Sequence, residues 1–511
     1  MKRNRFIFSH KNLIITTLIS KKRMIFYKIN RDFWRKRRMK KLIIIFLALF
    51  LSAGVVLIVV KHHESERAAS ELIKSRKFEG NAIRKKVVTN LVSPAEVRNG
   101  NIVINTHGIE GYTDKLSYFP GDTIQFKVHA PQSLFSIIFK RYGKTEEEVG
   151  SIPNLQGFSQ NYSPNAYQTG ANWKTTYEYK IPQNWRSGLY AAELSDSKGK
   201  FNVAFLIKSS QPEPKDIAVL SSTNTWEAYN NWGGKSLYSL QKINHKTIFQ
   251  HIVSFQRPNP SADPTGNIKH LASGEKYILG WLESKGYRYD MLADSDLSSN
   301  AKVLDPFKIL IISTHSEYWT LEMYNNIKSF LNRGGTVLYL SGNGMSWHAA
   351  LKDGQIEVMK NGGFLTLEKG RGGHFSDIGL SESRILGVKY RSTGFAYPAP
   401  YRVINPNHWI FAKTGLRKGD LMGEKGLNTV NNSLGGASGW ETDQMDRFSP
   451  KNTVLLAVGT NKGQKGADMT YYDTLKGGGV FSAGSITFGG SLAIDPKLSQ
   501  MVQNVIDRFN K

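Results

Sequence analysis

The chain has 511 residues, of which 40% are hydrophobic and 21% are charged. This is an ordinary globular composition, on a chain longer than a single hydrophobic core usually supports. There is no cysteine, which excludes disulfide bonds, thiolate zinc ligands and cysteine nucleophiles. The formal net charge of +27 raises the question of whether the protein binds nucleic acid.

The charge is concentrated near the N-terminus. Residues 1–41 hold 15 Lys and Arg against one acid, Asp32, and supply +14 of the net charge. The next 19 residues, Leu42–Val60, carry no charge and could form a helix long enough to span a bilayer. Basic residues beside an apolar run follow the positive-inside rule. We therefore expect a basic cytoplasmic segment (1–41), a transmembrane helix (42–60), a cell-membrane protein with its bulk outside the cytoplasm, and no nucleic-acid partner.

Met1 and Met39 are both candidate start residues, because Met39-Lys40-Lys41 before the apolar run also resembles the start of a secretory signal. No clear A-x-A-like cleavage site follows the run, so we expect an uncleaved anchor rather than a released form. The polar residues 61–87 then predict a stalk.

Two folded domains are predicted beyond the stalk. Residues 88–211 contain short β-rich runs separated by turn signals such as Pro120-Gly121, which predict a β-sandwich. In residues 212–511, apolar strand patterns (217–220, 309–312, 337–340, 454–458 and 480–483) alternate with amphipathic helical patterns (275–284, 321–332 and 497–509). Continuous apolar strands indicate a sheet covered on both faces, hence a doubly wound α/β domain whose ligands bind at the carboxyl ends of the strands.

Polar residues follow several of these strands. A loop rich in aromatic and asparagine residues, 221–238, follows the first one, and His315-Ser-Glu317 follows the strand at 309–312. A His-x-Glu turn suits metal ligation or acid–base chemistry, although capping residues and ordinary turns would explain it equally well. Asn343, in a Gly-Asn-Gly turn, and Glu441 are further candidates. The usual zinc-protease, serine-hydrolase and nucleotide-binding signatures are absent from the sequence.

Several motifs occur together and in order: Thr225-Trp-Glu-Ala-Tyr-Asn, Val253-Ser-Phe-Gln-Arg-Pro, His315-Ser-Glu-Tyr-Trp, Ser341-Gly-Asn, His408-Trp-Ile-Phe-Ala and Trp440-Glu-Thr-Asp. As a set they resemble the large (beta) subunit of N,N-dimethylformamidase and its C-terminal-domain relatives, over residues 180–505. The resemblance implies a glutamine-amidotransferase-like α/β fold without the thiol, and one iron ion held by two tyrosinates and a glutamate.

Carried over motif by motif, the resemblance implies the metal ligands Tyr190, Tyr229 and Glu317, with Tyr238 as a substitute for either tyrosine. It also implies four site residues around the metal: His315, Asn343, Lys360 and Glu441. Hard oxygen ligands of this kind suit Fe(III).

The expected function is therefore that of a membrane-anchored, extracytoplasmic, metal-dependent hydrolase of amide or related C–N bonds, with a small amide-like substrate. The alternative is a non-catalytic envelope protein that binds a glycan or a peptide. Convergence of the tyrosine hydroxyls on the Glu317 carboxylate would favour the enzyme. The anchor, and the lack of a small subunit in this chain, depart from the family, and a homo-oligomer is left open.

Overall fold

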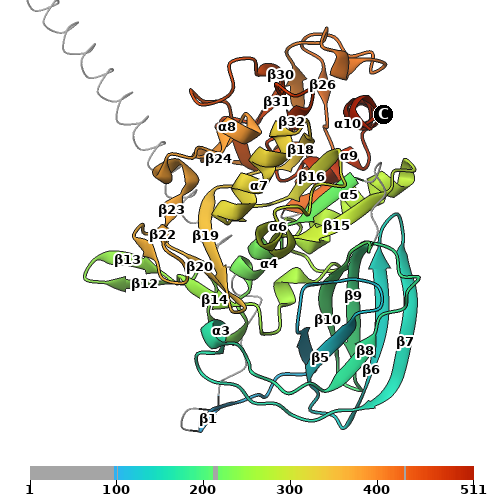
Figure 1. Cartoon of the computed structure of the whole chain (residues 1–511), viewed down its shortest axis with the longest axis vertical. Helices are drawn as coiled ribbons and strands as arrows, with labels where there is room; N and C mark the ends of the chain where they lie inside the picture. The colour runs from blue at the N-terminus through green and yellow to red at the C-terminus, as the bar shows by residue number, and fades with distance from the viewer. Residues whose placement is uncertain (1–96, 100–101, 211–216, 431–432, 511) are drawn as a thin grey trace, which may run out of the picture. The chain divides into compact units, whose positions relative to one another are not determined.

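Short apolar runs form the central sheet of the computed structural model (Figure 1). The structure describes residues 97–99, 102–210, 217–430 and 433–510, which belong to one unit, Ser93–Lys511. The predicted segments 1–41, 42–60 and 61–87 lie outside the described residues, as does the predicted boundary at 211–212, so these assignments stay predictions.

The central sheet has nine strands in the order β15-β11-β16-β18-β32-β31-β30-β25-β26. Its first five strands pair in parallel, and the pairings from β32 to β26 are antiparallel. In sheet order the strands are β15 (Tyr289–Ala293), β11 (Ile217–Ser221), β16 (Ile309–Thr314), β18 (Thr336–Ser341), β32 (Gly479–Ser482), β31 (Asp468–Asp473), β30 (Val454–Gly459), β25 (Tyr401–Val403) and β26 (Leu421–Met422).

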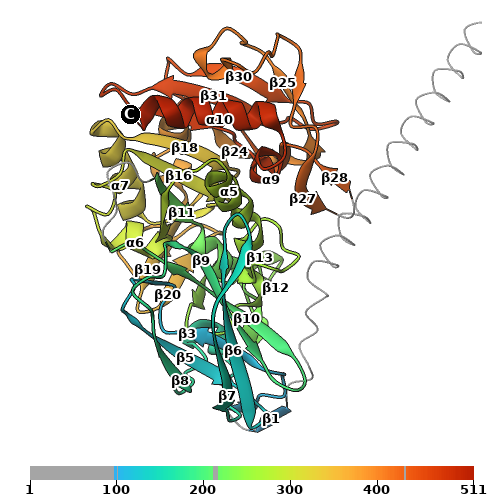
Figure 2. The same cartoon turned by 90° about the vertical axis from the view of Figure 1, so that its right-hand side faces the viewer.

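Helices cover both faces of this sheet, which explains why its strands are continuously apolar. One face packs against α5 (Ala272–Ser284), α9 (Phe488–Leu492) and α10 (Pro496–Phe509), and α10 crosses the near side in Figure 2. The other face packs against α6 (Asp294–Ser299), α7 (Leu321–Asn332) and α8 (Ser383–Leu386). Successive residues of β11 alternate between the two cores, with Val219 in one and Leu220 in the other.

The prediction of a glutamine-amidotransferase-like doubly wound fold is wrong. The chain is rich in strands, its large sheet is mixed rather than parallel, and many small sheets surround it. The error has a physical cause: burial on both faces makes a strand apolar whether its neighbours run parallel or antiparallel to it. The apolar pattern therefore located the strands without revealing their directions.

Residues 110–207 form two further sheets that share a core. A five-stranded sheet has the order β4-β10-β9-β6-β7, and a three-stranded sheet the order β3-β5-β8. Apolar side chains alternate along β5 and β6, so that Phe126 and Phe139 meet inside the core. The strands are β3 (Glu110–Thr113), β4 (Ser117–Tyr118), β5 (Thr123–His129), β6 (Leu134–Tyr142), β7 (Glu146–Gln156), β8 (Tyr177–Lys180), β9 (Gly188–Ser195) and β10 (Lys200–Ile207).

Short elements complete the described part of the chain. The helical ones are α3 (Ala166–Thr169), α4 (Thr223–Tyr229), η1 (Trp232–Gly234), η2 (Pro260–Ala262), η3 (Phe375–Ile378) and η4 (Trp409–Phe411). The strands are β1 (Val97–Asn99), β2 (Ile102–Ile104), β12 (Leu240–Ile243), β13 (Lys246–Phe249), β14 (Ile252–Ser254), β17 (Tyr318–Trp319), β19 (Trp347–Lys352), β20 (Gln355–Val358), β21 (Phe364–Leu365), β22 (Gly370–Arg371), β23 (Gly373–His374), β24 (Lys389–Ala399), β27 (Gly426–Val430), β28 (Ser433–Gly435) and β29 (Ser438–Gln444).

The predicted single-pass membrane location is not supported by the described residues. Within those ranges, none of the helices is long and apolar enough to cross a bilayer, and the predicted span 42–60 lies outside them.

Candidate functional site

A buried carboxylate lies just beyond the carboxyl end of β16. The strand ends at Thr314, whose φ of 52° turns the chain, and the backbone N–H of Glu317 donates to the Thr225 hydroxyl at 3.0 Å. The Glu317 side chain then accepts two hydrogen bonds, one from the Tyr238 hydroxyl at 2.6 Å and one from Trp347 Nε1 at 3.0 Å. With only 4% of its surface exposed, Glu317 is well suited to bind a cation or a proton donor.

Three tyrosines gather around this carboxylate. The ring centroids of Tyr229 and Tyr238 lie 4.4 Å apart, and the Tyr318 hydroxyl donates to the Tyr238 oxygen at 2.9 Å. Burial, and after it the negative charge of Glu317, raises the pKa of all three phenols well above the ordinary value. A phenolate at this place therefore requires a cation beside it.

His315 and Glu441 form an ion pair next to the tyrosines. The Nε2 atom of His315 lies 3.0 Å from Glu441 Oε2 and 3.6 Å from Glu317 Oε2. Burial lowers the pKa of His315, but the Glu441 and Glu317 carboxylates outweigh burial, and the net shift is upward. Burial raises the pKa of Glu441. His315 and a hydrogen bond from Asn343 outweigh this effect, so the net shift of the Glu441 pKa is downward. We infer an imidazolium beside a carboxylate, which can exchange a proton.

Asn343 is held in place by a buried aspartate. Its φ is 50°, in the left-handed region, and its backbone N–H donates to Asp443 Oδ1 at 2.9 Å. The Tyr339 hydroxyl donates to the other Asp443 oxygen at 2.6 Å. The side-chain amide of Asn343 then donates to Glu441 at 2.8 Å, so this turn orients the carboxylate that faces His315.

Lys360 lies against the same aromatic cluster. Its ammonium is 3.5 Å from the ring centroid of Tyr238 and 5.1 Å from that of Tyr318, which are cation–π distances. Burial lowers the pKa of Lys360 to about 8, against the opposing attraction of Glu317 and Glu441. The side chain is therefore largely positive at neutral pH and changes charge just above it.

Tyr190 is not brought to this cluster. It belongs to β9, whose register directs the side chain into the core of the two smaller sheets. There the ring stacks on Trp185, with 5.0 Å between centroids, and the hydroxyl donates to the Arg186 carbonyl at 2.7 Å. The six other predicted site residues do converge, and Tyr238, the substitute, occupies the place expected of a second tyrosine.

Sequence reasoning missed three residues of the cluster. Tyr318 and Trp347 contact Tyr238 and Glu317, and Tyr318 belongs to the His-Ser-Glu-Tyr-Trp motif, so a signal for it existed. The His270 ring lies 4.8 Å from Tyr229 and 5.4 Å from His315. Burial lowers the pKa of His270 to about 3, which keeps it neutral. Nothing in the sequence before α5 distinguishes His270 from any surface histidine.

The donor set suits a metal that prefers oxygen. Across the described ranges, no group of three or more His, Cys, Asp and Glu could hold a metal ion, whereas Tyr229, Tyr238 and Glu317 offer phenol and carboxylate oxygens. His315 Nδ1, His270 Nε2 and Asn343 Oδ1 are buried without a hydrogen-bond partner. Because such atoms are uncommon, they mark a place for a ligand or water. The residues therefore fit a hard cation.

Comparison with known proteins gives a consistent match. Residues 139–504 match the family described as N,N-dimethylformamidase beta subunit-like, C-terminal. The N,N-dimethylformamidase beta subunit of an Alcaligenes species is 26% identical over 66% of this chain, and that of Paracoccus aminophilus is 25% identical over 70%. These matches span 54% and 58% of the two relatives. A solved structure titled mmIFT52 N-terminal domain is 12% identical with a TM-score of 0.26, covering 43% of this chain and 83% of its own; this likeness is too weak to support an argument.

Proposed function

The chain belongs to the N,N-dimethylformamidase beta subunit-like family, and on that premise we propose that it hydrolyses the C–N bond of small amides with the help of iron. The observation that carries the proposal is the 2.6 Å hydrogen bond from Tyr238 to the buried Glu317, with the Tyr229 ring 4.4 Å from that of Tyr238 and His315 within 3.6 Å of the same carboxylate. A binding surface for a glycan or a peptide would not need two phenols gathered at a buried carboxylate beside an ion pair.

Tyr229, Tyr238 and Glu317 are the residues that would hold the metal. The tyrosines are neutral without a cation, because burial and Glu317 raise the pKa of each. A positive ion would lower both pKa values and release the protons. When bound, iron supplies Lewis-acid polarisation of the amide carbonyl and acidification of water.

The ion pair of Glu441 and His315 accepts and donates the protons of the hydrolysis. Glu441, with a lowered pKa, accepts a proton from the attacking water as the oxygen adds to the carbonyl carbon. His315, protonated beside it, donates a proton to the nitrogen as the C–N bond breaks. The products are a carboxylic acid and an amine, and the Lys360 ammonium offsets the negative charge that the two glutamates bring to the site.

A second subunit is part of the proposal, because both relatives carry the name beta subunit. The chain spans little more than half of their length, so the activity of the whole enzyme does not transfer to it without a test.

The test combines metal content with turnover. We expect the purified chain to contain about one equivalent of iron and to release dimethylamine from N,N-dimethylformamide, or an amine from a related small amide. Glu317→Gln should lose the iron, whereas Glu322→Gln, on the exposed side of α7, should keep it. Absence of iron from the wild-type chain, or full iron retention in Glu317→Gln, contradicts the metal assignment.

A further inference from the structure

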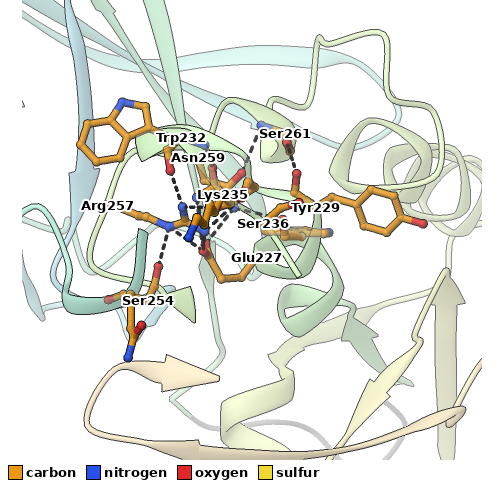
Figure 3. A network of polar contacts seen from close by, with 12 residues as sticks. Glu227, Tyr229, Trp232, Lys235, Ser236, Ser254, Arg257, Asn259 and Ser261 are labelled. Carbon is orange, nitrogen blue, oxygen red and sulfur yellow. Dashed lines mark hydrogen bonds and ion pairs between the residues drawn. The ribbon is translucent and has the colours of Figure 1, made fainter. Parts of the chain in front are cut away.

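The Arg257 side chain is entirely enclosed, and every one of its N–H groups is used (Figure 3). Its Nε donates to Glu227 Oε1 and to the Ser254 carbonyl, each at 2.9 Å. Its Nη2 donates to Glu227 Oε1 at 2.5 Å and to the Asn230 carbonyl at 3.0 Å. Its Nη1 donates to the Trp232 carbonyl and, at 3.0 Å, to the Lys235 carbonyl. A guanidinium has five such donors in a fixed plane, so it acts as a rigid template.

Three of these acceptors belong to one short segment. The carbonyls of Asn230, Trp232 and Lys235 all lie between Tyr229 and Tyr238, the two tyrosines of the candidate site. This segment contains a single 3-10 turn, in which Gly233 has a φ of 73°. Because so little regular structure holds the segment, its course depends strongly on the group at its centre.

The N-terminal end of the segment is fixed by the partner of Arg257. Glu227 lies two residues before Tyr229 on α4, and its carboxylate also accepts from Asn230 Nδ2 at 3.1 Å. The Ser261 hydroxyl donates to the Tyr229 carbonyl at 3.2 Å. The guanidinium therefore links the helix that carries Tyr229 to the turn that leads to Tyr238.

We infer that Arg257 is a positioning residue that sets the distance between Tyr229 and Tyr238, and thereby the affinity of the site for iron. The consequence for iron rests on the proposed function; the consequence for the segment does not. Arg257 contacts neither tyrosine side chain through the bonds described above and acts only through the backbone between them. A lysine, with one ammonium in place of the planar fork, cannot reach the same set of carbonyls.

The experiment compares Arg257→Lys with Arg141→Lys. Arg141 is a suitable control because it is also buried and ion-paired, with Glu283 at 2.5 Å, but belongs to β6. We expect Arg257→Lys to raise amide hydrogen exchange in residues 229–238 at least tenfold and to weaken iron binding at least tenfold. Arg141→Lys should leave both unchanged. Equal exchange in this segment for the two variants overturns the inference.

A second variant, Glu227→Gln, and the iron content of the wild-type chain distinguish the remaining outcomes. Glu227→Gln perturbs the pair more gently, so if Arg257→Lys does not fold, this variant should still raise exchange in 229–238 above that of Arg141→Lys; an equal value overturns the inference. If the wild-type chain holds no iron, the proposed function fails, whereas the exchange data still decide the role of Arg257.

Discussion

The Tyr238 hydroxyl and the Glu317 carboxylate, separated by 79 residues, are joined by a 2.6 Å hydrogen bond. Tyr238 follows α4 and Glu317 follows β16, so the contact exists only because β11 and β16 are neighbours in the central sheet. The carboxyl ends of parallel strands meet at one edge of a sheet, and that edge carries most of the candidate site.

Replacement of Tyr238 by Phe should reduce iron affinity by about tenfold or more, since the proposed metal ligand and the hydrogen bond to Glu317 are both lost. Iron titration with detection of the phenolate charge-transfer band would measure the effect. Tyr190→Phe is the matched control: it removes the hydrogen bond to the Arg186 carbonyl and should cost about 1 kcal/mol of stability without changing iron binding. The reverse result would restore Tyr190 as the ligand.

Activity should fall as pH rises through about 8, the pKa to which burial lowers Lys360. Below that pH the ammonium is charged and offsets Glu317 and Glu441; above it the charge is lost. In Lys360→Arg this alkaline limb of kcat/KM should move upward by more than one pH unit, because a guanidinium stays protonated. Lys352→Arg, at an exposed position, should leave the profile unchanged. An unmoved limb in Lys360→Arg would exclude Lys360 as its source.

Two substitutions of Asn343 should separate its backbone role from its side-chain role. Glycine accepts a φ of 50° without strain, whereas alanine does not, so Asn343→Ala should be about 1 kcal/mol less stable than Asn343→Gly in urea unfolding. Both variants lose the hydrogen bond to Glu441 and should lose activity equally.

Asn244 provides the control for that pair of variants. It also has a positive φ, 48°, in the exposed turn between β12 and β13. Asn244→Gly should therefore leave activity intact. Full activity in Asn343→Gly would show that the side-chain amide is not needed.

Glu275 should make the protein less stable as pH rises. Burial raises its pKa from 4.5 to about 7, despite hydrogen bonds from Ser221, Ser222 and Trp226. Because the folded pKa exceeds the unfolded one, the stabilisation is fully present below about 4.5 and is lost as pH rises to about 7, an effect on the order of 3 kcal/mol.

Urea unfolding of wild type and Glu275→Gln at pH 4.5 and pH 7.5 would test this expectation. The variant should gain stability relative to wild type at the higher pH. Glu322→Gln, at an exposed position, should show the same difference from wild type at both. A stability difference for Glu275→Gln that is independent of pH would contradict the expected shift.

Some of the local structure was predictable from the sequence. The apolar pattern predicted a helix over 321–332, and α7 spans Leu321–Asn332, with the Thr320 side chain capping its start by accepting from the Met323 N–H. Capping and periodicity are properties of neighbouring residues, so the sequence alone predicts them. The motifs that follow the strands likewise indicated His315, Glu317 and Asn343, which lie together in the structure.

The sequence by itself therefore indicated the family, five strands of the central sheet and three of the helices that cover it. It also predicted seven site residues, of which the structure brings six together. Only the tertiary structure decided the directions of the strands in the central sheet, because burial on both faces leaves the same apolar pattern in either direction. It also showed which tyrosine lies at Glu317: the register of β9 turns Tyr190 into a core, whereas the Tyr238 hydroxyl contacts the Glu317 carboxylate. Such choices depend on contacts between residues far apart in the chain, which the local sequence does not record.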